Sequence, residues 1–452
     1  MNLRTALRIQ PRDVVSLVGA GGKTSTMFRL AHELTAARLK VVTTSTTKIG
    51  LPTPEQSGCF IVAEDRAQLL DEVRQALLVE RHVTVACTQY DAEKFAGLPP
   101  EWIADLQALP DVHAVIVEAD GSRKLPLKAP RPGEPVIPEA TTILVAVSGM
   151  SAVGVPLDEE HVCRADMVSA ITQLPLGSLV RAEDLAIVLA HANGGLKYRP
   201  PAARTVALLN QADDAQRLAE ARKVAEALRE SGGFDETLIA SVTGEDPVRE
   251  RWGRVTAIIM AAGEGRRFGG AIKQLASWHE RTLIRHIVDI VEKSQADEIQ
   301  IVLGANANVI RAQLGELGPR TRVTLNSSWV EGMSTSLLSG LAQSQVNPNA
   351  AIFINVDQPG IHPALIDQMI DRHFRTGALI VAPRFQNMRG NPVLWDRGLF
   401  EELKTLRGDV GGREILRQHW RDINWVELNS EEELTDTDTP EEYQRLKEIL
   451  NA

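Results

Sequence analysis

Residues 255–269 read VTAIIMAAGEGRRFG, and Lys273 follows shortly after them. The apolar run Val255–Ala261 predicts a buried strand of a parallel sheet, because such strands are covered on both faces. The glycine-rich stretch after it predicts a loop with exposed backbone N–H groups, which suits a polyphosphate when arginines and a lysine lie beside them. The three glycines of this loop do not have the spacing of the dinucleotide-binding fingerprint. The stretch therefore favours a nucleoside triphosphate as the ligand.

This loop resembles the signature of the nucleotidyltransferases that attach a nucleotide to molybdopterin. Its opening, Ala261-Ala262-Gly263, is closer to the cytidylyltransferase branch of that family than to the guanylyltransferase branch. Later segments fit the same family in order and spacing: Asn355–Pro359, Gly390–Leu394 and Thr435–Tyr443. The resemblance covers about residues 254–452 and implies a fold like that of the nucleotide-diphospho-sugar transferases. It also implies CTP and molybdopterin as substrates and Mg²⁺ as the metal ion.

Carboxylates in these segments are candidate metal ligands. Asp357 follows the apolar run Ala351–Asn355, which places it at the carboxyl edge of the sheet, where ligands bind in open α/β folds. A hard oxygen ligand suits Mg²⁺ there, although an isolated aspartate in this position more often caps the next helix. Asp436 and Asp438 precede Pro440 and would also serve as helix caps. The resemblance implies that one of the two completes the metal site and favours Asp438. The chemistry and spacing of the two aspartates do not distinguish between them as metal ligands.

The resemblance also implies roles for individual residues. Lys273, Arg267 and Asp357 would be the catalytic groups. The two cations would neutralise the triphosphate, and Asp357 would bind the metal ion. The implied nucleotide-binding residues are Ala261, Ala262, Gly263, Gly265, Arg267, Lys273, Asn326, Gly332 and Ser334. Molybdopterin would contact Asn391, and also Arg413, which follows the loop 408–412. One departure from the family pattern is Gly270–Ile272, which replaces more polar residues before the lysine.

A second phosphate-binding pattern lies near the start of the chain. Gly19-Ala20-Gly21-Gly22-Lys23-Thr24 follows the predicted strand Val14–Val18 and opens a helix, the context that a P-loop needs. Position 17 is Leu rather than Gly, and the shorter pattern resembles the loop of amide-forming Mur-type ligases. Lys23 would reach the terminal phosphates of ATP or GTP, and Thr24 would bind Mg²⁺. Glu118 or Asp120, at the end of another predicted strand, would hold a water bound to that ion.

Three segments of this half together resemble the accessory proteins associated with selenium-dependent molybdenum hydroxylases. They are the loop at Gly19–Ser25, the run Thr43–Lys48 and the strand end Glu118–Arg123. The resemblance covers about residues 10–240. It implies a molybdenum hydroxylase as the client of this protein, but it does not define the reaction of the N-terminal half.

Composition and the order of predicted elements set the architecture. The chain of 452 residues is too long for one core, and alternating strands and helices predict an α/β protein with two Rossmann-like parallel-sheet domains. The N-terminal domain, 1–245, is P-loop-like, and the C-terminal domain, 254–452, is a nucleotidyltransferase. The polar segment Thr243–Arg251 is the predicted linker between them.

Charge and cysteine usage exclude several classes of function. The net charge of −10 with no basic tract argues against a nucleic-acid partner. Three scattered cysteines give neither a disulfide framework nor a zinc site, and no apolar stretch is long enough for a membrane span. A cytoplasmic protein is the expectation.

The leading hypothesis is therefore molybdenum cofactor maturation by transfer of CMP from CTP to molybdopterin, with release of pyrophosphate. Alternatives with the same fold are a guanylyltransferase and a sugar-phosphate nucleotidyltransferase. An alternative of another class is a non-catalytic cofactor chaperone that uses nucleotide as a switch.

Overall fold

The computed structural model describes all residues except 92–93, 266, 409–411 and 452. The chain forms two compact units, Met1–Trp252 and Gly253–Ala452, and each is described by itself. Within the described residues, no helix combines the length and the apolar character needed to cross a membrane.

The N-terminal unit is built on a nine-stranded sheet in the order β14-β13-β12-β10-β1-β8-β2-β5-β4. Eight of its strands are parallel, and β14 at one edge is antiparallel to β13. The strands are β1 (Asp13–Gly19), β2 (Val41–Ser45), β4 (Phe60–Val62), β5 (His82–Ala86), β8 (Ala114–Glu118), β10 (Ile143–Gly149), β12 (Arg204–Asn210), β13 (Glu236–Ala240) and β14 (Val248–Trp252). Small sheets are formed by β3 (Lys48–Gly50), β6 (Thr88–Gln89) and β7 (Lys94–Ala96), and by β9 (Leu127–Lys128) and β11 (Val162–Cys163).

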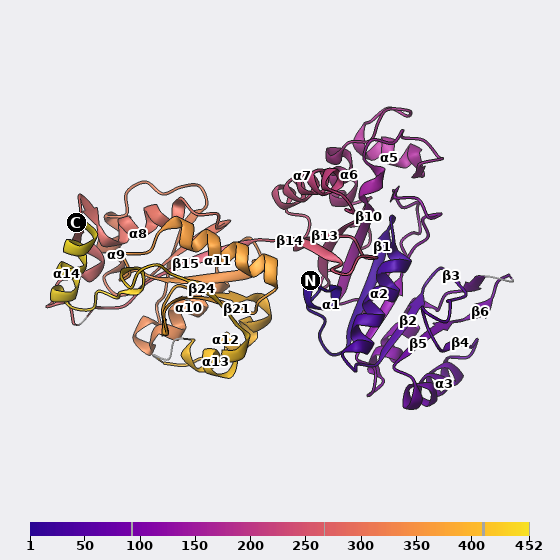
Figure 1. Ribbon diagram of the computed structural model, residues 1–452, viewed down its shortest axis with the longest axis horizontal. Helices are drawn as coiled ribbons and strands as arrows, with labels where there is room; N and C mark the ends of the chain where they lie inside the picture. Colours follow the sequence, from indigo (N-terminus) through magenta and orange to yellow (C-terminus); the bar gives the residue numbers. More distant parts are fainter. Residues whose placement is uncertain (92–93, 266, 409–411, 452) are drawn as a thin grey trace. The chain divides into compact units, whose positions relative to one another are not determined.

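The central strands carry apolar side chains on both faces of this sheet, and helices therefore cover both faces. One face packs against α1 (Leu3–Ala6) and α2 (Lys23–Ala36), and α2 crosses the sheet in Figure 1. The other face packs against two groups of helices: α3 (Arg66–Val79) with α4 (Ile103–Ala108), and α5 (Ala165–Thr172) with α6 (Ala182–Ala190) and α7 (Ala215–Ser231). The segment with the phosphate-loop pattern thus connects the central strand β1 to α2 on one face of the sheet.

The predicted linker is wrong in its second half. Residues Val248–Trp252 form the edge strand β14, and only the segment before them is a loop. The inward-facing Arg251 is almost completely buried and forms an ion pair with Glu236 of β13, so a charged residue occupies a position that an apolar pattern would mark as core.

The C-terminal unit contains a mixed sheet, whereas the sequence predicted a parallel-sheet domain. Its parallel part runs in the order β19 (Thr321–Leu325), β18 (Glu298–Leu303), β15 (Val255–Ala261) and β20 (Ala350–Asn355). Next to β20, β23 (Val393–Asp396) is antiparallel and pairs with β21 (Ile380–Phe385). The sheet is completed by β22 (Met388–Arg389) and β24 (Ile423–Glu427), both paired with β21. A separate hairpin contains β16 (Ser277–Trp278) and β17 (Arg281–Thr282).

Two layers of helices cover this sheet (Figure 1). One layer contains α8 (Leu283–Glu292), α9 (Ala307–Ala312) and α11 (Pro363–Thr376). The other contains α10 (Met333–Ala342), α12 (Phe400–Leu403) and α13 (Arg413–Gln418). The last helix, α14 (Pro440–Asn451), packs against the loop that follows β15 through Tyr443 and Leu446. The carboxyl ends of β15 and β20, which are adjacent and parallel, remain free for a site.

Candidate functional site

The C-terminal site lies at the carboxyl ends of β15 and β20. Met260 of β15 is in register with Asn355 of β20, so the loops that leave these strands begin side by side. The first loop contains Gly263 and Gly265, and Gly265 has a positive φ of 66°. The side chain of Gln274 closes this loop, because its Nε2 donates to the carbonyls of Ala261 and Gly263 at 3.1 and 2.7 Å.

Lys273 connects this loop to the two other acidic segments. It is 5% exposed, and its Nζ lies 2.9 Å from Oδ2 of Asp357 and 3.2 Å from Oδ1 of Asp438. Arg267 pairs with the other oxygen of Asp438 at 2.9 Å, but its side chain is 75% exposed. One buried and one exposed cation therefore face the same carboxylate, and the exposed arginine is free to turn toward a ligand.

Asp436 lies in the same acidic cluster and is affected by it. Burial and the charges of Asp357 and Asp438 raise the pKa of Asp436 and Lys273 opposes the shift, so that this pKa lies at about 6. Three carboxylates near Lys273 and Arg267 leave an excess of negative charge, which disfavours ionisation of Asp436. Such a cluster is typical of a site that binds a cation.

A threonine between the two aspartates holds them in place. Thr437 is fully buried, and both its backbone N–H and its hydroxyl donate to the carbonyl of Asp357 at 2.9 Å. These two bonds fix the segment 436–438 against the end of β20.

A pocket of about 450 Å³ opens beside these groups. It is lined by residues from the loop after β15, the turn before α10 and the end of β20: Met260, Ala261, Ala262, Gly263, Glu264, Gly265, Arg267, Lys273, Gln274, Trp329, Val330, Gly332, Met333, Ser336, Asn355, Val356, Asp357 and Asp438. Its volume is within the range of small-molecule sites.

The loop that lines this pocket is also held from outside. Phe268 is buried and packs edge-on against Tyr443 of α14, with ring centroids 5.6 Å apart. The same aromatic cluster includes Trp278. The C-terminal helix therefore fixes the far side of the loop, so that Arg267 and Lys273 are presented from an anchored segment.

In the N-terminal unit, the loop between β1 and α2 has the shape of a phosphate-binding turn. Gly19, Gly21 and Gly22 all have positive φ angles, of 94°, 80° and 120°. A Cβ on Gly21 would lie 2.1 Å from the backbone nitrogen of Gly149, so this close approach needs glycine. Lys23, 2% exposed, folds back over the loop and donates to the carbonyl of Gly19 at 2.7 Å.

Acidic residues at the end of β8 face this lysine. Lys23 Nζ lies 3.2 Å from Asp120 and 3.7 Å from Glu118. The hydroxyl of Thr24 donates to Glu118 at 2.8 Å. Burial raises the pKa of Glu118, while Lys23 and Thr24 act against that shift. The structure thus brings the predicted residues Lys23, Thr24, Glu118 and Asp120 into contact.

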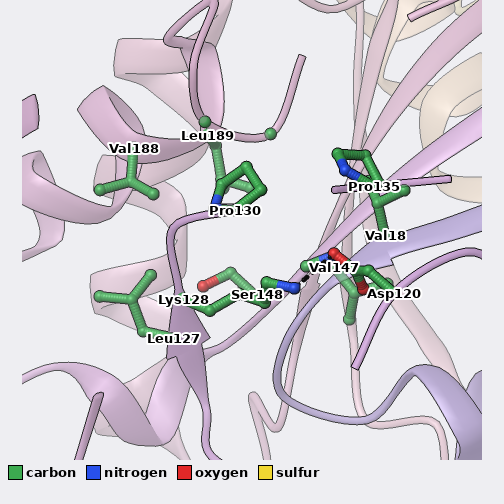
Figure 2. Close-up of a pocket in the computed structure, with 13 residues that line it drawn as sticks. Val18, Asp120, Leu127, Lys128, Pro130, Pro135, Val147, Ser148, Val188 and Leu189 are labelled. Atoms are coloured by element: carbon green, nitrogen blue, oxygen red, sulfur yellow. Dashed lines mark hydrogen bonds and ion pairs between the residues drawn. The ribbon is translucent and has the colours of Figure 1, made fainter. Parts of the chain in front are cut away.

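A small cavity of about 20 Å³ lies behind the loop, which is room for about one water molecule. Figure 2 shows the side chain of Lys128 reaching Asp120 beside this cavity, and Nζ of Lys128 lies 2.7 Å from Oδ2 of Asp120. Lys128 also pairs with Glu134 at 3.5 Å, which in turn binds Arg164 at 2.7 Å. Asp120 therefore lies between two buried lysines.

Known protein families match each of the two units. The family described as "YqeC protein" matches residues 15–166, and the family described as "MobA-like NTP transferase domain" matches residues 257–423. The chain is 34% identical over 198 residues to the "Uncharacterized protein YqeC" of Escherichia coli (strain K12), which covers 44% of this chain and 75% of that protein.

The chain contains a YqeC domain and a MobA-like NTP transferase domain. It is also 32% identical over 200 residues to the "Nicotine blue oxidoreductase" of Paenarthrobacter nicotinovorans, covering 42% of this chain and 96% of that protein. Among solved structures, Rv0371c from Mycobacterium tuberculosis H37Rv matches 43% of this chain and 97% of its own, with 25% identity and a TM-score of 0.39. The MobA-like domain supports a nucleotidyltransferase.

Some predicted residues of the MobA-like domain lie outside the pocket lining. Asn326 is 4% exposed and donates to the hydroxyls of Thr335 and Ser336, so it supports the pocket wall instead of facing the ligand space. Ser334 is 1% exposed, and its N–H donates to the carbonyl of Gly408. Asn391 is half-buried and Arg413 is exposed; neither lines the pocket. In the predicted loop 408–412, residues 409–411 lie outside the described residues.

Sequence reasoning missed Gln274 and Thr437. Both act through hydrogen bonds to backbone carbonyls, and a glutamine after Lys273 or a threonine between two aspartates carries no pattern that indicates such a bond. Their positions beside predicted site residues were the only available signal.

The acidic cluster of the MobA-like domain fits a divalent cation. Within the described residues, Oδ1 of Asp357 is buried and has no hydrogen-bond partner. No group of three or more His, Cys, Asp or Glu side chains in the described part of the chain has the arrangement of a complete metal site. Mg²⁺ does not need one, because it is usually held by one or two carboxylates together with substrate phosphates and water. Asp357 with Asp436 or Asp438 meets that requirement.

Proposed function

We propose that the MobA-like domain transfers CMP from CTP to the terminal phosphate of molybdopterin and releases pyrophosphate. The observation that carries the proposal is Lys273, a buried cation held between Asp357 and Asp438 in the wall of a 450 Å³ pocket that the glycine loop also lines. Nucleotidyl transfer needs a gripped triphosphate, a metal site and an aligned acceptor, and the pocket offers groups for the first two.

The transfer assigns a task to each group. An oxygen of the acceptor phosphate attacks the α-phosphorus of CTP, and the bond from that phosphorus to the bridging oxygen breaks, so that pyrophosphate leaves. Lys273 and Arg267 stabilise the negative charge on the phosphates, and the loop N–H groups around Gly263 and Gly265 bind them. A Mg²⁺ ion held by Asp357 and by Asp436 or Asp438 would neutralise the charge that develops on the leaving pyrophosphate. The acceptor is its own nucleophile, so no protein nucleophile is required.

The roles proposed for the remaining residues follow the family resemblance. Ala261, Ala262 and Gly332 would contact the nucleotide, while Asn326 and Ser334 would support its pocket. Asn391 and Arg413 would contact molybdopterin.

For the YqeC domain we propose nucleotide binding at the loop Gly19–Thr24, with Mg²⁺ at Thr24 and at Glu118 or Asp120. Lys23 contacts both carboxylates and Thr24 contacts Glu118, and the three positive-φ glycines give the loop the shape of a phosphate-binding turn. The finished cofactor would pass to a molybdenum hydroxylase, including selenium-dependent ones.

The test of the proposed transfer is pyrophosphate release from CTP and from GTP, with molybdopterin and Mg²⁺. We expect release that depends on CTP and falls at least about 100-fold in Asp357→Ala, because the variant loses both a metal ligand and the partner of Lys273. Asp371→Ala is the matched control, since Asp371 is an exposed aspartate of α11 that does not line the pocket.

Each alternative gives a different result in this assay. Release with GTP alone would indicate a guanylyltransferase, and release with a sugar 1-phosphate in place of molybdopterin a sugar-phosphate nucleotidyltransferase. No release with any acceptor would overturn the proposal. It would leave a cofactor chaperone or a redox activity such as the one in the name of the Paenarthrobacter relative.

A further inference from the structure

Asn210, the last residue of β12, connects the phosphate loop of the N-terminal unit to the neighbouring strand. The side chain is 3% exposed. Its Nδ2 donates to the carbonyl of Gly21 at 2.8 Å, and its Oδ1 accepts from the N–H of Val242 at 3.1 Å. A Cβ on Gly22 would lie 2.3 Å from this Nδ2, so the contact depends on glycine in the loop. One side chain thus ties the loop to the segment that follows β13.

Asp213 lies three residues after Asn210, at the same edge of the sheet. The hydroxyl of Ser241, the first residue after β13, donates to Oδ1 of Asp213 at 2.6 Å. The N–H of Ala212 donates to the carbonyl of Ala240 at 3.0 Å, which fixes the backbone beside it. The carboxylate is therefore oriented, although its side chain is still 48% exposed.

Other residues cap the helix and hold the loop that lie next to Asp213. Asp214 caps α7 by accepting from the N–H of Arg217, so Asp213 is not needed as the cap. Arg217 pairs with Asp213 at 3.4 Å, but the two side chains are 40% and 48% exposed, and a surface pair of this kind is weak enough for a ligand to displace. The segment after Ser241 is held by Arg29 of α2, which donates to the carbonyls of Gly244 and Glu245.

We propose that the N-terminal unit binds a guanine nucleotide and that Asp213 is the residue that selects the base. The proposal rests on nucleotide binding at the Gly19–Thr24 loop, to which Asn210 links this edge. Guanine presents two adjacent donors, N1–H and the exocyclic N2 amine, which a carboxylate accepts together. Adenine has an acceptor nitrogen in its ring where guanine has N1–H. The partial negative charge of that nitrogen would repel the carboxylate. A site built around such a pair rejects a base that lacks the donors.

The test is a titration of the full-length protein with the fluorescent analogues mant-GDP and mant-ADP. The C-terminal domain is also expected to bind nucleotides, so only the component of binding that Lys23→Ala removes is counted. We expect mant-GDP to bind more tightly than mant-ADP in this component by roughly 10- to 100-fold, the discrimination typical of one bidentate contact to a base.

Replacing the carboxylate should change the preference in a specific way. In Asp213→Asn, mant-GDP should lose roughly 10- to 100-fold in affinity. Competition by xanthosine diphosphate should increase, because xanthine offers a carbonyl where guanine has its amine and can pair with an amide. Asp214→Asn is the matched control: asparagine also caps a helix, so this variant should keep the preference for guanine.

The two possible failures are distinguishable. Equal binding of mant-GDP and mant-ADP, unchanged by Asp213→Asn, would overturn the choice of base but keep the phosphate loop as a nucleotide site. If Lys23→Ala removed no component of binding at all, nucleotide binding at the loop would itself be wrong, and the base assignment with it.

Discussion

Lys273 shows how one residue holds together the acidic groups of the C-terminal site. It is buried, lies between two carboxylates and is held from a loop that Gln274 and Phe268 fix. A lysine in this position keeps the acidic groups together before any ligand arrives. Since Lys273 and Arg267 bring two positive charges to three carboxylates, a divalent cation or a protonated carboxyl balances the remaining negative charge.

Asp436 gives a pH-dependent prediction. Its pKa is about 6 in the folded protein and near 3.8 when unfolded. A raised pKa in the folded state contributes stability below pH 3.8, and that contribution is lost as the pH rises through 6. We expect Asp436→Asn to be more stable than wild type at pH 8 by about 1–2 kcal/mol, after allowing for solvent screening, and by about half as much at pH 5.

The measurement is thermal unfolding of both proteins in EDTA at pH 5 and pH 8. A stability difference that does not change with pH would contradict the raised pKa. Adding Mg²⁺ at pH 8 should stabilise the wild type more than the variant, because the cation favours the ionised carboxylate.

Among the helices and strands, the central strands were predicted well and the edge strand β14 poorly. The strand Val255–Ala261 was correct to the residue, because an unbroken apolar run between polar segments has few other interpretations. β14 was assigned to a linker because its inward-facing positions include Arg251, whose burial depends on Glu236 from a different strand. The antiparallel β23 was likewise assigned to a parallel sheet, since strand direction depends on connections that local pattern does not encode.

The same limit applies to the site. The glycine loop and the place of Asp357 at a strand end were predicted from local pattern, and the choice of Asp438 came from the family resemblance. The structure brings Lys273, Asp357 and Asp438 together. Whether Asn326 faces the ligand or braces the pocket wall depends on where Thr335 and Ser336 lie after folding. Sequence spacing does not contain that information.

Glu236 is the centre of the edge formed by β12, β13 and β14, and it provides the second stability prediction. Its side chain is fully buried and accepts from Arg251, Arg8 and Arg204 at 2.7, 2.9 and 3.4 Å. Burial alone would raise the pKa of Glu236, but the three arginines together lower it to about 2. We expect Glu236→Gln to lose about 3–5 kcal/mol of unfolding free energy at pH 7, because buried guanidinium groups lose their counter-charge.

Chemical denaturation measures this loss, with Glu250→Gln as the control on the same edge. Glu250 pairs with Arg222 at the surface and should cost about 1 kcal/mol or less. The lowered pKa means that the contribution of Glu236 is present above pH 4.5 and is lost as the pH falls toward 2. The penalty of the variant should therefore shrink on acidification, and a penalty equal to that of Glu250→Gln at pH 7 would refute the prediction.

Each of the two units has its own sheet and its own apolar clusters. The boundary between them falls after Trp252, because β14 belongs to the first sheet. The sequence placed the end of the first domain at residue 245, which would remove this strand. Fragments of the chain that end at these two boundaries should therefore differ in stability.

We expect the fragment 1–252 to unfold cooperatively and the fragment 1–245 to melt roughly 10 °C lower or to aggregate. The shorter fragment lacks Arg251, so Glu236 loses its shortest ion pair, and β13 becomes an unpaired edge that invites association. It also loses the bond from the N–H of Val248 to the carbonyl of Met1. Differential scanning calorimetry and size-exclusion chromatography of the two fragments make the comparison. Equal melting temperatures with both fragments monomeric would mean that β14 does not stabilise the domain and that residue 245 is an adequate boundary.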